Sequence, residues 1–327
     1  ELDRLVKALA DSVDTSNPST SPEAVKPLSE YNQSVRARVQ EDSPGFYSLM
    51  EESLGTGHQG LVDTLEYMAD TDSFDRGYSL LAKRLLPIVK RLGMDFKDSS
   101  ESSDPKAGQY RGFYDPNTDT IYMTDYSPET LLHETIHAIT WHVLHGKGPF
   151  GKGSVGASAK KLVSQFKGLQ FQLNAHITKN FDKFSPTQKE FIETARSVKN
   201  PGMLEDVDEL LSYGFTSPIG QRILSMIPAT GKIATTTNNA LKSFISSIKD
   251  FMGISDQTAA SALDDVLTLG EDVLKFAEEN VEDVARAVAE VKNNYQAYLS
   301  KANEEAPSDK PRPVLKRTSK VVSIFGK

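Results

Sequence analysis

Two histidines placed four residues apart are the strongest constraint on this chain. His133 and His137 enclose Glu134 in the pattern H-E-x-x-H, within an apolar run over residues 131–138. On a helix, residues at this spacing lie one turn apart on the same face, so both imidazoles can reach one metal ion. Glu134 can take a proton from a metal-bound water. The pattern predicts a zinc site, and the alternative is a chance match on a core helix.

The composition narrows the ligands that such a site can use. The chain of 327 residues contains no cysteine, which excludes thiolate ligands and leaves His, Asp and Glu. The formal net charge of −8 gives no general reason to expect nucleic-acid binding. The best apolar stretch, residues 80–92, contains basic side chains, so we expect no membrane span.

The start of the chain predicts no signal peptide, because it has neither a basic segment nor an apolar one. The first residue is not methionine, which indicates a processed product or a fragment of a larger protein. Residues 1–13 predict a short amphipathic helix, and residues 14–27, rich in Ser, Thr, Asn and Pro, predict a linker.

A β-rich segment stands between helical patterns and the motif. Residues 94–96 can open a strand, and residues 108–123 predict strand, turn and strand. Ser127 suits the N-cap of a helix and Pro128 its first position, so the motif helix should start here. Apolar residues at helical spacing predict earlier helices over 28–42, 46–70 (with a break at 55–57) and 75–92.

Beyond the motif helix, residues 146–156 are rich in glycine. Gly153 stands where a phosphate-binding loop needs Ser or Thr, so we do not expect a nucleotide site. A mobile loop over a cleft and a plain flexible connector fit this composition equally. Helical patterns follow over 157–180, 186–199, 203–213, 217–227, 231–253 and 256–303, the last as two helices meeting near Glu279.

The fold class predicted from these patterns is α+β and predominantly helical, with a small sheet and an antiparallel C-terminal helical packing unit. The expected divisions are a helical arm over 1–72, a core over 73–228 that carries the motif, a helical region over 229–305 and a basic flexible tail over 306–327.

A third histidine ligand is not expected. The spacing H-E-x-x-H-x-x-G-x-x-H would need glycine and histidine where the chain has Thr140 and Val143. His142 and His145 lie further along the same helix, beyond easy reach of the ion. We interpret them as partly exposed histidines at the helix end.

A carboxylate from the acidic helix 203–213 is the better third ligand, with Glu209 as the first choice. Ser212 follows it at about one turn, and a small residue there lets two helices approach closely. One observation points the other way, because the apolar face of this helix lies opposite Glu209. The helix must then be buried on both sides, with Tyr213 and Phe215 covering the second. Other acidic residues remain possible: Glu205, Asp206 and Asp208.

Two of these residues have candidate catalytic roles. Glu134 would act as the general base on a metal-activated water. Tyr213, one turn after Glu209, is a candidate donor to the oxyanion, although a core or surface tyrosine is the alternative. We expect the strand over 120–123 to pair with an extended peptide through its backbone edge.

The order of helix, strand, hairpin and L-L-H-E-T-I-H-A resembles the zincin-like metallopeptidase fold. The segment that begins at Glu209, E-L-L-S-Y-G-F-T-S-P-I-G-Q-R-I-L, is similar to the glutamate-bearing segment of gluzincin-type peptidase domains in large bacteriophage polyvalent and virion proteins. The later segments K-S-F-I-S-S-I-K-D-F-M-G-I and S-A-L-D-D-V-L resemble the same domains. The resemblance covers residues 73–269.

The resemblance implies a zinc-dependent peptidase with one Zn²⁺, bound by His133, His137 and Glu209, and with Glu134 as base. The sequence differs from the family in having a gap of about 70 residues between His137 and Glu209. Tyr213 also stands where classical gluzincins have an acidic residue, so the partner of one ligand histidine is unassigned.

The resemblance also implies partners and a location. We expect a polypeptide substrate, possible contacts with other phage or host proteins, and a virion or the bacterial host cytoplasm. One rival hypothesis is a structural virion protein that retains the zincin fold without turnover. A second is a helical module that binds nucleic acid through its basic tail; this rests on the tail alone, and nucleic acid is not an expected partner.

Overall fold

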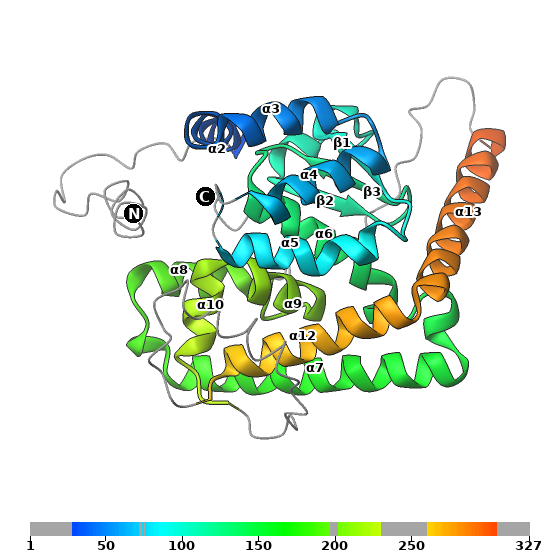
Figure 1. Cartoon of the computed structure of the whole chain (residues 1–327). Coiled ribbons are helices and arrows are strands. Elements are labelled where there is room, and N and C mark those ends of the chain that lie inside the picture. Colours follow the sequence, from blue (N-terminus) through cyan, green and yellow to red (C-terminus); the bar gives the residue numbers. More distant parts are fainter. Residues whose placement is uncertain (1–27, 72–73, 75, 197–201, 230–259, 306–327) are drawn as a thin grey trace.

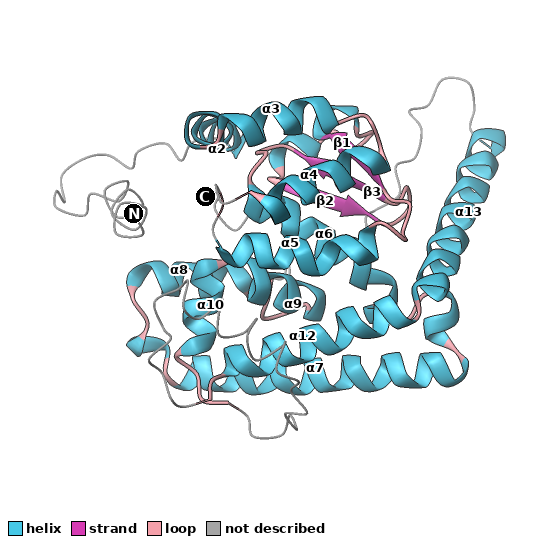
Figure 2. Ribbon diagram, in the orientation of Figure 1, coloured by secondary structure: helices cyan, strands magenta, loops and turns pink. Residues whose placement is uncertain are grey.

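A computed structural model describes residues 28–71, 74, 76–196, 202–229 and 260–305. These residues form a mostly helical α+β fold around one small sheet (Figures 1 and 2). The predicted helix over 1–13, the linker over 14–27, the helix over 231–253 and the basic tail over 306–327 lie outside the described residues.

The helices before the sheet agree with the apolar periodicity. Gly55 and Gly57 adopt φ values of 85° and 69°, which glycine tolerates, and they separate the two helices predicted within 46–70. The short segment between these helices also contacts the first strand, since Gly55 N donates to Phe96 O. The four helices are α2 (Leu28–Asp42), α3 (Pro44–Ser53), α4 (His58–Asp70) and α5 (Arg76–Val89).

The sheet has three strands in the order β1-β3-β2. β1 (Asp95–Asp98) runs parallel to β3 (Thr120–Met123), and β2 (Gly112–Asp115) runs antiparallel to β3. β3 is therefore the central strand, with a neighbour on each edge. The expectation that residues 120–123 offer an edge to a peptide is wrong, because the chain itself already pairs both edges of this strand.

The helix that carries the motif, α6 (Pro128–Leu144), is the centre of the fold. It begins as predicted, with the Ser127 side chain accepting a hydrogen bond from Thr130 N and proline in the first turn. Every residue from Thr130 to Leu144 is buried. The sheet covers one side of α6, while α5, α9 and α12 pack on its other sides (Figure 1).

The glycine-rich segment is neither a loop over the metal-ligand motif nor a plain connector. Gly148–Gly151 forms the 3-10 helix η3, and Phe150 within it is fully buried. η3 packs against α7 (Gly153–Lys179) and α13 (Val281–Glu305). Gly148 has a φ of 52° and a built Cβ would lie 3.0 Å from Ala287 Cα, so glycine is required here.

The described helices that follow α6 lie mostly below it in the view of Figure 1. α8 (Pro186–Ala195), α9 (Val207–Thr216) and α10 (Pro218–Ser225) follow α7. α12 (Ala262–Glu279) lies along α7 and against α9, and α13 leaves it after Asn280, where the sequence predicts the change (Figure 1). The antiparallel neighbour of α12 among the described helices is therefore α7 and not α13.

One buried hydrophobic cluster contains residues from α3 through α13. It therefore crosses the divisions predicted at 72/73 and 228/229, and each of the three regions contributes side chains to the same core. A second, small cluster of Ala107, Phe113 and Tyr122 lies on the other face of the sheet. No helix within the described ranges is long and apolar enough to cross a membrane.

Candidate metal centre

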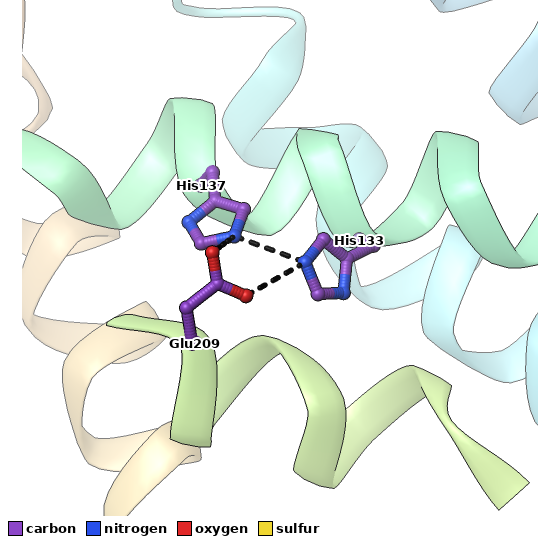
Figure 3. Close-up of side chains that lie close together, drawn as sticks. All are labelled: His133, His137 and Glu209. Carbon is purple, nitrogen blue, oxygen red and sulfur yellow. Dashed lines mark hydrogen bonds and ion pairs between the residues drawn. The ribbon is translucent and has the colours of Figure 1, made fainter. Parts of the chain in front are cut away.

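Two helices far apart in the sequence bring three side chains together. His133 and His137 lie on α6, and Glu209 lies on α9, which packs directly against it (Figure 3). One ligand atom from each residue lies within 4.8 Å of the other two, and all three residues are buried. In the part of the chain that the structure describes, this is the one group of His, Cys, Asp and Glu that could hold a metal ion.

The nitrogen and oxygen atoms of the three side chains face one another across short distances. The Nε2 atoms of His133 and His137 lie 3.0 Å apart. His133 Nε2 lies 3.4 Å from Glu209 Oε2, and His137 Nε2 lies 3.7 Å from Glu209 Oε1. Two imidazole nitrogens and a carboxylate are a donor set suited to a first-row divalent cation.

Each imidazole makes a polar contact through its Nδ1 atom. His137 Nδ1 lies 2.9 Å from Asp208 Oδ2, which can only accept, so this nitrogen donates. The Thr216 hydroxyl donates to Ser212 O at 2.7 Å and therefore accepts from His133 Nδ1 at 3.2 Å. Because both Nδ1 atoms carry the proton, the Nε2 lone pairs point toward each other and toward Glu209.

This arrangement favours a cation between the ligand atoms. Two lone pairs 3.0 Å apart repel each other unless a proton or a metal ion lies between them. Burial acts to lower the pKa of His137, but the carboxylates of Asp208 and Glu209 raise it well above its ordinary value. Burial lowers the pKa of His133. Burial would raise the pKa of Glu209, but the imidazoles lower it to about 2.

Glu134 stands beside the three ligand residues and is not one of them. Its side chain is buried, and within the described residues Oε2 has no hydrogen-bond partner. Burial raises the pKa of Glu134 to about 8, against a hydrogen bond from the backbone of Tyr114 in β2. A buried carboxylate oxygen without a partner is costly, which indicates that this oxygen has a partner in the working protein.

Tyr213 lies next to the ligands, as the sequence suggests. Its ring meets that of His133 edge to face, with centroids 4.6 Å apart. Burial and the charge of Glu209 raise the pKa of Tyr213 well above 10. The phenol therefore keeps its proton at neutral pH and can act only as a neutral donor or acceptor.

The apolar face of α9 lies opposite Glu209, but this does not keep Glu209 from the site, because α9 is buried on both sides. It lies between α6 and α12, so Leu210 and Leu211 are fully buried while Glu209 on the opposite face is also buried. The helix starts at Val207 and not at 203, because the Asp206 side chain caps it. Asp206 and the exposed Glu205 stay outside the metal-ligand group.

The other histidines of α6 stay outside the group, but the expected exposure is wrong for His142. It is fully buried, with Nε2 3.2 Å from the Tyr114 hydroxyl, which donates to Asp119 Oδ1 at 2.8 Å. The end of α6 is enclosed by neighbouring elements, which the sequence of the helix alone does not reveal. His145 is exposed and stacks on Trp141.

Sequence reasoning missed the roles of Asp208 and Thr216. The sequence offers Asp208 only as an alternative to Glu209, although an acidic residue directly before the ligand is also a suitable partner for a histidine. Comparisons with protein-family models, with curated proteins and with solved structures found no significant match.

Proposed function

We propose that this chain is a zinc-dependent peptidase with a zincin-like core. One observation carries the proposal: His133, His137 and Glu209 converge, while the adjacent Glu134 keeps a buried carboxylate oxygen that has no hydrogen-bond partner among the described residues. Three protein ligands and a nearby general base are the usual set of a catalytic zinc site, which keeps its fourth position for water.

The distances support zinc as the ion. Ligand atoms at about 2.0–2.1 Å from a tetrahedral zinc lie about 3.4 Å from one another. The two Nε2 atoms lie 3.0 Å apart, and each lies 3.4 or 3.7 Å from one of the two Glu209 oxygens, so the separations between the donor side chains are close to that value. The acceptors behind each Nδ1 also match the support that ligand histidines generally receive.

Each residue then has a role. A bound zinc would supply a water of lowered pKa and a Lewis acid for the scissile carbonyl. Glu134 would take the proton of that water and pass it to the leaving amine. Tyr213 would donate a hydrogen bond to the oxyanion, since its phenol stays protonated. Asp208 and Thr216 would orient the two imidazoles.

An extended substrate would lie along β2 and not along β3. β2 is an edge strand of the sheet, and Tyr114 within it donates a backbone hydrogen bond to Glu134. A built Cβ on Gly112 would lie 3.3 Å from Glu134 Cγ, so the strand passes directly beside the proposed base. Peptides commonly bind to a sheet edge through backbone hydrogen bonds.

Elemental analysis and a peptide library test the proposal together. The purified chain should hold about one zinc, and His133→Ala should lose it, because three-ligand sites depend on every ligand. His145→Ala is the matched control, since this histidine directly follows the last residue of the same helix but is exposed. Glu134→Gln should keep the zinc and lose cleavage. Cleavage that persists in Glu134→Gln would refute the mechanism, and zinc without cleavage in the wild type would indicate a metal-holding protein without turnover.

A further inference from the structure

Two charged side chains lie at the start of α6, next to the candidate metal centre. Glu129 precedes His133 by four residues, so both occupy the same face of the helix. Burial and the charge of Glu209 raise the pKa of Tyr213. The charge of Arg111 lowers this pKa, and that of Glu129 raises it. Both side chains are therefore within electrostatic reach of a ring that packs on His133.

The Arg111 side chain already makes hydrogen bonds to other side chains. Its Nε donates to Asp125 Oδ2 at 2.6 Å, and Nη2 donates to Ser127 Oγ at 3.1 Å. The Asp125 side chain is completely buried. Glu129 Oε2 lies 3.5 Å from Arg111 Nη2, at the limit of a hydrogen bond. One cation thus faces two carboxylates, and the excess negative charge remains at Glu129.

Glu129 is also more exposed to solvent than the three candidate ligands. Its side chain is 26% exposed, whereas those of His133, His137 and Glu209 are 6%, 5% and 7% exposed. Burial nevertheless raises the pKa of Glu129, and Arg111 offsets this only in part. A carboxylate that is mostly surrounded by protein and lacks full compensation gains from meeting a cation.

We propose that Glu129 is a specificity residue that receives a cationic group of the substrate, either a Lys or Arg side chain or a free N-terminal ammonium. This inference rests on the proposed peptidase function. One helical turn of about 5.4 Å separates Glu129 from His133, and an extended peptide rises about 3.3 Å per residue. The cation therefore lies within about two residues of the bond that is cut.

The opposite assignment, with Arg111 receiving a substrate carboxylate, does not fit the charges. An incoming carboxylate would meet Asp125 and Glu129 beside the Arg111 guanidinium. It would also have to displace a hydrogen bond of 2.6 Å between Arg111 and a buried aspartate. Arg111, Asp125 and Glu129 together carry one excess negative charge, so a cation is the ligand that these three side chains favour.

Paired peptides that contain lysine or the neutral norleucine at matched positions test the inference in the zinc-loaded protein. We expect kcat/KM to favour the lysine peptide by about tenfold, the order of one partly desolvated ion pair. Glu129→Gln should abolish this preference, and Glu129→Lys should favour peptides that contain glutamate instead. Glu51→Gln, an exposed change on α3, is the matched control. N-acetylated peptides distinguish a side-chain cation from the terminal ammonium.

Fluorescence anisotropy of the same peptides with zinc-loaded Glu134→Gln separates this inference from the proposed function, because binding needs no turnover. A lysine preference in binding that depends on Glu129 supports the inference even if no peptide is cleaved. Cleavage without that preference overturns the inference and leaves the peptidase function in place, whereas binding without it overturns the inference alone. If Glu129→Gln loses zinc or thermal stability, its loss of preference is attributed to misfolding. The peptide preference in binding of the double variant Glu129→Lys, Glu134→Gln then tests the inference. A chain that neither binds nor cleaves any peptide overturns both.

Discussion

Replacing Asp208 by asparagine removes one negative charge from behind the candidate metal centre while preserving the shape of the side chain. Asp208 Oδ2 lies 2.9 Å from His137 Nδ1, and Thr140 Oγ1 donates to its other oxygen at 3.1 Å. Asparagine can still accept from His137 through its carbonyl oxygen, and its amide can donate to Thr140. The change is therefore mainly electrostatic.

The magnitude follows from the path between Asp208 and the ion. A hydrogen bond, the width of an imidazole and a metal–nitrogen bond place the carboxylate at about 7 Å from a bound zinc. Zinc with one carboxylate ligand has a net charge of one, and two unit charges at about 7 Å interact by about 2 kcal/mol at an effective dielectric of about 20. We expect the zinc affinity of Asp208→Asn to fall by about 30-fold, within the range of about 10–100-fold for such partners.

Competition against a fluorescent chelator measures this affinity directly. Asp206→Asn is the matched control, because Asp206 is the neighbouring carboxylate that caps α9 and asparagine is an equally good cap. Equal zinc affinities for Asp208→Asn and Asp206→Asn would show that Asp208 does not support His137 as the distances indicate.

Three further changes test the electrostatics and packing of the centre. Because the pKa of Glu209 falls to about 2 in the folded state, its contribution to the unfolding free energy is present above about pH 4.5 and is lost toward pH 2; acid titration of the metal-free protein should show this loss, and Glu209→Gln should lack it. Burial raises the pKa of Glu134 to about 8, so ionisation of this carboxyl favours the unfolded chain as pH rises from about 4.5. In urea denaturation at pH 7, Glu134→Gln should therefore stabilise the metal-free protein by on the order of 3 kcal/mol. A Cβ on Gly270 would lie 2.2 Å from Phe215 Cε2, so Gly270→Ala should lower the unfolding free energy by about 1–3 kcal/mol, whereas Gly168→Ala, in open space on α7, should not lower it.

The features that the sequence predicts well are local ones. Apolar periodicity locates most of the described helices, and the chemistry of Ser127 and Pro128 locates the start of α6. The spacing of His133 and His137 places both imidazoles on one face, because four residues make about one turn of any α-helix. These results depend only on neighbours in the chain, so no knowledge of the fold is needed to obtain them.

The strand order and the enclosure of α6 need the tertiary structure. β3 follows β2 in the chain and could have been an edge strand, but β1 pairs with its other side. His142 lies near the end of α6 and could have been exposed, but it is buried against Tyr114. Pairing and burial of this kind depend on contacts between segments far apart in sequence, which local propensity does not encode.

The third ligand shows the boundary between the two kinds of information. Residue spacing alone places two histidines on one helix face, with an acidic segment about 70 residues later. Only the packing of α9 between α6 and α12 brings Glu209 to the histidines and turns the neighbouring Asp208 toward His137. The physical reason is that successive residues of a helix point about 100° apart, so the placement of the whole helix decides which carboxylate faces the site.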